Sequence, residues 1–271
     1  MLDENNKYCG GYCGNQPRNC SARVLWIDLP ANIVEWKNKW QDYMKDLFEA
    51  CDSIITATNF TKSMFLEHYN NLSEDDITII EHGRDLIRYD NNYSVPTQHQ
   101  PIKILIPGVI GPHKGQDFIK ELKKKDTENK FELHYIGQVD DEMKEIGKYH
   151  GAYEREDFAK WVYKIKPSFI GIFSVCAETY SHTLTEAICS GVPVLASNLG
   201  ALKTRIESQG GGWLIDINDV EKTYHQILEI SKNKEEYKNI TQNLKNIEIS
   251  TSKEMGEKYK KVYDKLICEN S

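Results

Sequence analysis

The chain contains Glu178-Thr-Tyr-Ser-His-Thr-Leu-Thr-Glu186-Ala-Ile-Cys-Ser-Gly-Val-Pro-Val194, in which two carboxylates stand eight positions apart. The pattern predicts a helix over about 182–190, followed by a Gly-Val-Pro-Val turn that leads into a strand. Eight residues at helical pitch rise about 12 Å, so the two carboxylates can reach different parts of one elongated ligand. Backbone N–H groups at the start of the helix would lie between them and favour an anion. The stretch therefore predicts a ligand site at a loop–helix junction.

Strand-like and helical segments alternate on both sides of this stretch. The predicted strands are 102–106, 132–136, 169–173, 193–196 and 213–215, and the predicted helices are 116–125, 155–164, 182–190, 201–208 and 219–231. The strand-like runs are almost continuously apolar, which is typical of a parallel sheet buried on both faces. We therefore expect an α/β fold with a Rossmann-like parallel sheet and helices on both faces.

The sequence before residue 95 shows a shorter α/β pattern. Its predicted strands are 24–28, 53–57 and 77–80, and its predicted helices are 33–50 and 61–69. A polar, turn-prone segment at 87–100 is the best candidate for a linker. We therefore predict a partial N-terminal α/β segment over 1–95, a main domain over 96–252 and a charged C-terminal helix within 253–271.

Composition excludes several classes of protein. The 271 residues carry a net charge of −7, which argues against a nucleic-acid-binding protein with a basic stripe. No apolar run approaches the roughly 20 residues that span a bilayer, and the N-terminus lacks the apolar region of a signal peptide. We expect a cytoplasmic protein, and a peripheral position at the inner membrane face stays open.

Seven cysteines, an odd number, fit a reducing compartment better than a disulfide framework. Cys9, Cys13 and Cys20 cluster among glycines, and either a small zinc knot or a loop with free thiols would explain them. The other four cysteines lie in apolar stretches and are expected to be buried.

Loops that follow strands are the places where ligands bind in open α/β sheets. The loop Pro107–Gly115 contains Gly108, Gly111, His113 and Lys114. Its glycines allow the backbone to approach a ligand closely, and Lys114 supplies a positive charge where a helix begins. This composition suits a diphosphate, although a turn with a surface lysine is the alternative interpretation. The spacing is neither that of a P-loop nor that of the dinucleotide fingerprint.

A second glycine-containing loop follows the predicted strand 132–136. It comprises Gly137 and, further on, Tyr149-His150-Gly151-Ala-Tyr153. A backbone-rich loop with an aromatic side chain can hold a nucleobase, whereas His150 alone would more often be structural. Glu186 lies beside Ala187 and Ile188 at a helix–sheet junction, where burying a free carboxylate is costly.

Four motifs together resemble the nucleotide-binding half of retaining GT-B glycosyltransferases, the family-4 group. They are Lys114-Gly115, Glu178-x7-Glu186, Gly191-Val-Pro-Val194 and Gly210-Gly-Gly-Trp-Leu214. The sequences of residues 108–115 and 178–186 also resemble those of a bacterial subgroup associated with surface glycans. The resemblance is specific over about 77–268 and looser over 1–76.

The resemblance implies roles for individual residues. Lys114 and Glu178 would be the catalytic pair, with Lys114 at the donor diphosphate and Glu178 at the donor sugar. Glu186 would hold the ribose hydroxyls, and N–H groups from Tyr180 to Thr183 would face the phosphates. The full set expected to bind the donor is Gly108, Gly111, His113, Gly115, Gly137, His150, Gly151, Tyr153, Tyr180, Ser181, His182, Thr183 and Glu186.

The implied activity is transfer of a sugar from a UDP- or GDP-sugar to a glycan or lipid-linked acceptor, with retention, as part of polysaccharide biosynthesis. The leaving phosphate would help to deprotonate the acceptor, so neither a metal nor another cofactor is expected. Fixed positive groups at the diphosphate would make the largest contribution, because negative charge develops there.

The sequence departs from the family pattern in three places. Val109 occupies the position of a usual arginine, for which His113 or Arg84 could substitute. Tyr180-Ser181 replaces a usual Phe-Gly pair. Only about 95 residues precede the linker, where complete enzymes of this type carry an N-terminal Rossmann domain with a catalytic histidine.

Two alternatives therefore stay open. One is a non-catalytic nucleotide-sugar-binding subunit or fragment that needs a separate acceptor domain. The other is a different Rossmann-type enzyme such as a dehydrogenase, which the missing dinucleotide fingerprint disfavours.

Overall fold

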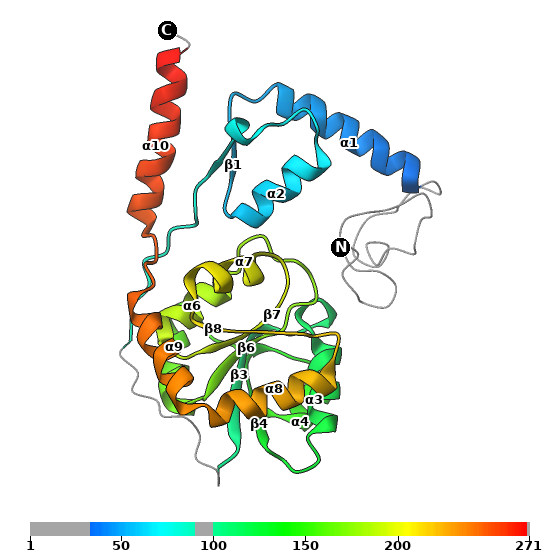
Figure 1. The fold of residues 1–271 in the computed structure, drawn as a ribbon, viewed down its shortest axis with the longest axis vertical. Coiled ribbons are helices and arrows are strands. Elements are labelled where there is room, and N and C mark those ends of the chain that lie inside the picture. The colour runs from blue at the N-terminus through cyan, green and yellow to red at the C-terminus, as the bar shows by residue number, and fades with distance from the viewer. Residues whose placement is uncertain (1–32, 90–99, 270–271) are drawn as a thin grey trace. The chain divides into compact units, whose positions relative to one another are not determined.

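A computed structural model of the chain describes residues 33–89 and 100–269 (Figure 1). These residues belong to two compact units: unit 1 comprises Met1–Asp85 with Ile249–Ser271, and unit 2 comprises Leu86–Glu248. The predicted strand at 24–28, most of the predicted linker, and Cys9, Cys13 and Cys20 lie outside the described residues.

The described residues of unit 1 form a small two-stranded parallel sheet and three helices. Its elements are α1 (Ile33–Glu49), β1 (Ile54–Thr56), α2 (Asn59–His68), a 3-10 turn η2 (Glu74–Asp76), β2 (Ile77–Ile79) and α10 (Ser252–Glu269). The ring of Phe48 packs edge-on against Phe65 and Tyr69, at centroid distances of 5.3 and 4.8 Å. These aromatic contacts hold the end of α1 on α2.

The start of α10 is tied to the segment that follows β2. Arg84 N–H donates to Ser250 O at 2.7 Å, and Ser252 N–H donates to Asp85 Oδ1 at 3.1 Å. A Cβ on Gly83 would stand 2.2 Å from Thr251 O, so the close approach of the two backbones requires glycine there. The C-terminal helix therefore belongs to the same unit as residues far earlier in the chain.

Unit 2 is built on a six-stranded, entirely parallel sheet in the order β5-β4-β3-β6-β7-β8. The strands are β3 (Ile102–Val109), β4 (Phe131–Gln138), β5 (Lys148–Tyr149), β6 (Phe169–Ile172), β7 (Val194–Ser197) and β8 (Gly212–Ile215). The chain runs outward from β3 to β5 and then returns to β6 on the other side of β3. The junction between β3 and β6 is therefore the topological switch point, where ligands bind in such sheets.

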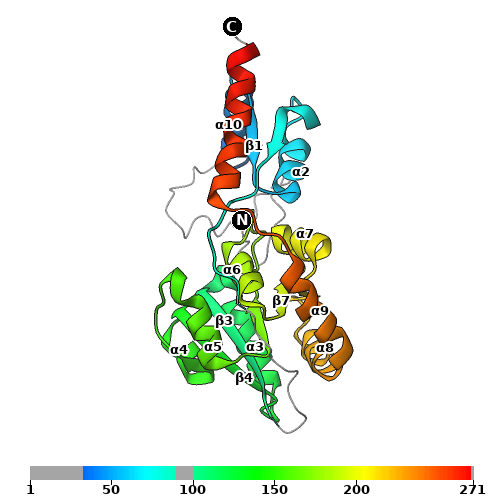
Figure 2. The same ribbon diagram turned by 90° about the vertical axis from the view of Figure 1, so that its left-hand side faces the viewer.

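Helices cover both faces of this sheet, which confirms the predicted Rossmann-like fold (Figures 1 and 2). They are α3 (Gln116–Lys125), α4 (Asp141–Ile146), α5 (Phe158–Ile165), α6 (His182–Ser190), α7 (Gly200–Gln209), α8 (Val220–Lys232) and α9 (Lys234–Asn246), with 3-10 turns η3 (Pro112–Lys114) and η4 (Arg155–Asp157). Helices α8 and α9 lie side by side (Figure 2).

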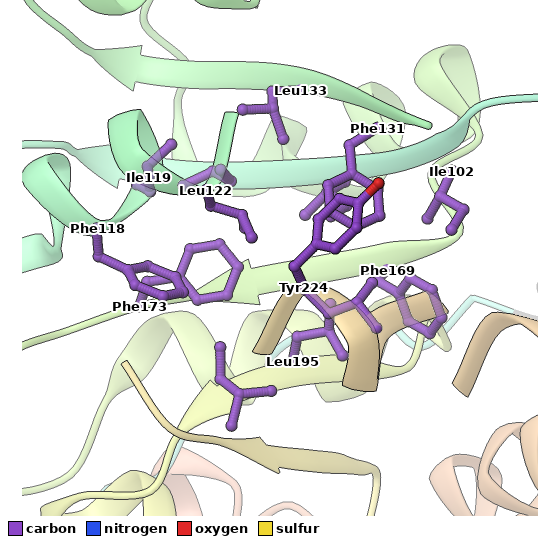
Figure 3. Close-up of a cluster of buried hydrophobic side chains, with 14 of the residues drawn as sticks. Ile102, Phe118, Ile119, Leu122, Phe131, Leu133, Phe169, Phe173, Leu195 and Tyr224 are labelled. Carbon is purple, nitrogen blue, oxygen red and sulfur yellow. The ribbon is translucent and has the colours of Figure 1, made fainter. Parts of the chain in front are cut away.

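The main core lies between one face of the sheet and α3 and α8 (Figure 3). The ring of Phe131 from β4 meets Tyr224 from α8 at 5.2 Å, and Phe118 from α3 meets Phe173 at 5.3 Å. The alternate strand residues Leu105, Ile170 and Val194 are fully buried outside this cluster. Burial on both faces explains why the strands are continuously apolar.

Three elements of unit 2 were not predicted from the sequence. Strand β5 has two residues, α4 has six, and α9 is a mostly polar helix that buries only Tyr237 and Leu244. Tyr237, the half-buried Ile240 and Leu244 nevertheless recur at helical spacing, so the signal for α9 was present in the sequence and the prediction missed it. The predicted helix at 155–164 is instead η4 followed by α5.

The prediction that the four remaining cysteines are buried is wrong for two of them. Cys189 is buried and Cys176 is half-buried, but Cys51 and Cys268 are exposed. Cys51 follows the end of α1, and Cys268 lies on an exposed side of the last turns of α10. No helix in the described part of the chain combines the length and apolarity needed to cross a membrane.

Candidate functional site

The loops after β3 and β6 meet at the switch point of unit 2. His113 O accepts a hydrogen bond from Val175 N–H at 3.1 Å. Gly115 has a φ of 78°, and a Cβ there would stand 2.1 Å from Phe173 O. Only glycine combines this left-handed conformation with so close an approach. The contact fixes the position of Lys114, the residue immediately before it.

Lys114 and Glu178 form an ion pair across these two loops. Their Nζ and Oε1 atoms are 2.5 Å apart, and their side chains are 30% and 15% exposed. The Ser174 hydroxyl donates to the same carboxylate oxygen. Burial raises the pKa of Glu178. The Lys114 charge and the hydroxyl and ammonium groups around the carboxylate (Lys114, Ser174 and Ser181) outweigh burial and lower this pKa below its ordinary value. The carboxylate is therefore ionised at neutral pH.

Glu186 forms a second carboxylate–cation pair in the middle of α6. Glu186 is 7% exposed, and its Oε1 lies 3.1 Å from Nε of Arg155, whose side chain is 51% exposed. The pKa of Tyr153 is raised by burial, by the charge of Glu186 and by a hydrogen bond to Glu186. The charge of Arg155 lowers this pKa, but by less. The Tyr153 hydroxyl therefore stays protonated and donates to Glu186.

The turn between the two carboxylates has an unusual backbone. Ser181, the N-cap of α6, has φ 70° and ψ 89°, a region that residues other than glycine seldom adopt. A residue held there costs on the order of 1–3 kcal/mol, and its surroundings must compensate. One such contact is the hydrogen bond from Ala201 N–H, at the start of α7, to Glu178 O at 2.9 Å. The shape of this turn therefore costs free energy of folding.

Two glycines of the predicted donor site lie on neighbouring strands, and a third follows the next strand. Gly108 and Gly137 are paired in register at the ends of β3 and β4, and Gly137 N–H donates to Gly151 O at 2.8 Å. A Cβ on Gly137 would stand 2.1 Å from Gly108 O. Gly137 therefore allows two backbones to approach closely, whereas a Cβ on Gly108 or Gly151 would meet open space.

His150 takes part in a side-chain network of its own. Its Nε2 lies 2.8 Å from Nδ1 of His134, and Nε2 of His134 lies 2.6 Å from Oε1 of Glu132. The imidazole planes differ by 2° and the centroids are 5.1 Å apart, so the rings lie edge to edge along the hydrogen bond. His150 also packs against Trp161 of α5. These contacts favour the structural interpretation of His150 over a direct role at a nucleobase.

The surroundings of His113 disfavour it as a replacement for the positive charge that is missing at Val109. Burial and the neighbouring Lys114 lower the pKa of His113 below its ordinary value, with Glu178 opposing them more weakly. A histidine shifted in this direction is mainly neutral at pH 7. Arg84, the other candidate, belongs to unit 1.

Sequence reasoning missed three side chains of this region: Arg155, Ser174 and Arg205. Arg155 stands two positions after Tyr153, Ser174 opens the loop after β6, and Arg205 lies in α7. None belongs to a motif, and an arginine within a helix is ordinarily a solvated residue. Only their spatial neighbours reveal them. In the described part of the chain, no group of three or more His, Cys, Asp or Glu residues could hold a metal ion.

Solved structures with the same fold are numerous. A glycosyltransferase from Rickettsia africae aligns with a TM-score of 0.64 and 18% identity, covering 85% of this chain and 67% of its own. Sucrose-phosphate synthase from Thermosynechococcus elongatus aligns with a TM-score of 0.66 and 15% identity, covering 89% and 67%. Anabaena Alr3699/HepE, in complex with UDP and glucose, aligns with a TM-score of 0.66 and 14% identity, covering 83% and 66%.

At these identities the structural matches establish the GT-B fold alone. The chain spans about two thirds of the length of these three proteins and 46% of TarM from S. aureus. No curated protein sequence matches the chain. The family model described as "Glycosyl transferases group 1" matches residues 91–247, more than half of the chain, and the chain therefore belongs to this glycosyltransferase family.

Proposed function

We propose that unit 2 binds a UDP- or GDP-sugar and that the protein transfers the sugar, with retention, to a glycan or lipid-linked acceptor. The observation that carries this proposal is the meeting of Lys114 and Glu178 at the switch point, next to the start of α6. A diphosphate there would gain from the ammonium group and from the backbone N–H groups at the helix N-terminus.

The two carboxylates would act at different parts of the donor. Glu178, with its lowered pKa, would contact the sugar hydroxyls as an ionised acceptor. Glu186, buried under Arg155 and Tyr153, would accept the ribose hydroxyls. The open space beside Gly108 and Gly151 would leave room for the rest of the nucleotide.

The chemistry follows from these positions. Breaking the sugar–phosphate bond produces an oxocarbenium-like sugar and a negatively charged diphosphate, which Lys114 and the helix N-terminus would stabilise. In a reaction on one face of the sugar, the leaving phosphate takes the proton of the acceptor hydroxyl. This sequence of events needs no protein base at the acceptor and yields retention.

The UDP complex of Alr3699/HepE supports UDP as one candidate donor. A second candidate function is donor binding without turnover, with the acceptor site on another domain or chain. The small two-stranded sheet described in unit 1 favours it, and a related structure was solved as a GtfA/B complex.

Isothermal titration calorimetry with UDP and GDP tests the binding half of the proposal. A panel of UDP- and GDP-sugars in a thermal-shift assay then identifies the donor, because ligand binding raises the apparent stability of the folded state. Transfer or donor hydrolysis by the chain would support the enzyme. Binding without either reaction would support the second candidate, and no binding of either nucleotide would contradict both.

A further inference from the structure

Arg205 of α7 lies directly behind the turn that precedes α6. It is 4% exposed. Its Nη1 donates to Tyr180 O at 3.1 Å and to Ser181 O at 3.0 Å, and its Nη2 donates to Thr185 Oγ1 at 3.1 Å. The guanidinium carbon also lies 4.3 Å from the centroid of the Tyr180 ring. One side chain therefore holds the turn and the first part of α6 together.

These two carbonyls belong to the peptide groups on either side of Ser181. The angle between those two planar peptides is set by φ and ψ of Ser181 alone. Because one nitrogen of Arg205 binds both carbonyls, it restrains both dihedral angles at once. This explains how a serine keeps a φ of 70° at this position.

The same hydrogen bonds decide where two backbone donors point. In a trans peptide the N–H is directed opposite to the C=O. With Tyr180 O and Ser181 O turned toward Arg205, the N–H groups of Ser181 and His182 point to the opposite side of the turn. They are the first donors at the N-terminus of α6, where the dipole favours an anion.

We propose that Arg205 is a positioning residue for the donor diphosphate. Its guanidinium locks the two peptides around Ser181 and so aims the N–H groups of Ser181 and His182 at the phosphates, without touching the donor. The inference rests on the proposed function, since it assigns the phosphate-facing side of the same site. A lysine cannot replace Arg205, because an ammonium group lacks the planar fork that reaches both carbonyls and Thr185.

The test compares Arg205→Met and Arg205→Lys with the unsubstituted chain. Binding of UDP and GDP is measured by calorimetry, and binding of uridine and guanosine by ligand-observed NMR. Both variants should bind the nucleoside diphosphates at least about tenfold more weakly, with nucleoside binding unchanged, because only phosphate contacts are lost. Lys203→Met, which removes an exposed cation from the same helix, should change neither affinity.

Ser181 provides the rescue experiment. Glycine adopts a positive φ without cost, so Ser181→Gly in the Arg205→Met background should restore part of the lost UDP or GDP affinity. Ser181→Val in the chain with Arg205 intact should reproduce the loss, because a β-branched residue resists this conformation. Thermal unfolding and near-UV circular dichroism show whether each variant folds. If Arg205→Met does not fold, Ser181→Val alone tests whether the conformation of Ser181 controls nucleotide affinity.

Equal losses for nucleosides and nucleoside diphosphates would overturn the role of Arg205 alone, as would a complete lack of rescue by Ser181→Gly. If the unsubstituted chain bound neither UDP nor GDP, the proposed function would fall together with this inference.

Discussion

The two carboxylates of the site are eight residues apart in the sequence, yet the structure treats them differently. Glu178 shares one oxygen between Lys114 and Ser174, and both members of its ion pair are largely covered. Glu186 is the more deeply buried carboxylate, but its cation, Arg155, is half-exposed and comes from a three-residue turn.

The difference concerns how firmly each cation is held. Lys114 lies in a loop that the close contact of Gly115 with Phe173 fixes in place. Arg155 has no comparable anchor in η4, and an ion pair with a solvated partner contributes little free energy. We therefore expect Lys114–Glu178 to be a permanent part of the site, whereas ribose hydroxyls could displace Arg155 from Glu186.

The largest expected effect comes from Lys114→Ala. The substitution should weaken binding of UDP or GDP by about 1–3 kcal/mol, because a charged hydrogen-bond donor to the diphosphate is lost. Calorimetry measures the change, and Lys124→Ala on the exposed side of α3 is the matched control. An unchanged affinity would show that Lys114 serves only to neutralise Glu178.

The next effect in size is expected for Glu186→Gln. This isosteric change should weaken UDP or GDP binding by about 1–2 kcal/mol, since a charged acceptor for the ribose hydroxyls becomes neutral. The unsubstituted chain should bind the 2′-deoxy nucleotide less tightly than the ribonucleotide. If Glu186→Gln kept that preference in full, Glu186 would not be the ribose contact.

Acid should weaken the Lys114–Glu178 ion pair and with it the stability of the folded protein. The pKa of Glu178 lies below its ordinary value of 4.5 in the folded protein, so the unfolded state binds the proton more readily. The stabilisation is complete well above pH 4.5 and is lost as the pH falls through the folded pKa. Urea unfolding at pH 7 and pH 4 should show a steeper loss for the unsubstituted chain than for Glu178→Gln, and equal losses would contradict this.

The smallest effect on nucleotide binding is expected for Arg155→Met. Because the ribose hydroxyls would displace this half-exposed cation from Glu186, nucleotide affinity should stay within about fivefold of the original value. The free energy of unfolding should fall more clearly, by about 1–3 kcal/mol, because the buried Glu186 carboxylate loses its cation. A loss of affinity as large as that of Lys114→Ala would instead identify Arg155 as a diphosphate contact that replaces the arginine missing at Val109.

Much of unit 2 could be predicted from the sequence because its signals are local. The apolar runs of β3, β4 and β6 are set by burial on both sides of the sheet, and the periodic face of α3 by packing on one side of the helix. Helix α6 is buried on all sides from Leu184 to Ser190 and has no single periodic face. The expectation from two loops after strands was that Lys114 and Glu178 belong to one site, but their ion pair was not predicted. The structure brings these residues to 2.5 Å.

Other features gave no local signal. Nothing in the sequence around Arg155 separates it from a solvated arginine. The positive φ of Ser181 could not be predicted either, because a serine, unlike a glycine, does not indicate this conformation.

The sequence alone determined the α/β class of unit 2, the order of its main strands and helices, and the family motifs around Glu178 and Glu186. These follow from hydrophobic periodicity and from residue types at fixed spacings. Only the tertiary structure decided how the two carboxylates differ, because their partners come from distant parts of the chain. Lys114 arrives from the loop after β3, Arg155 from η4 and Arg205 from α7, and the order of the strands brings them together.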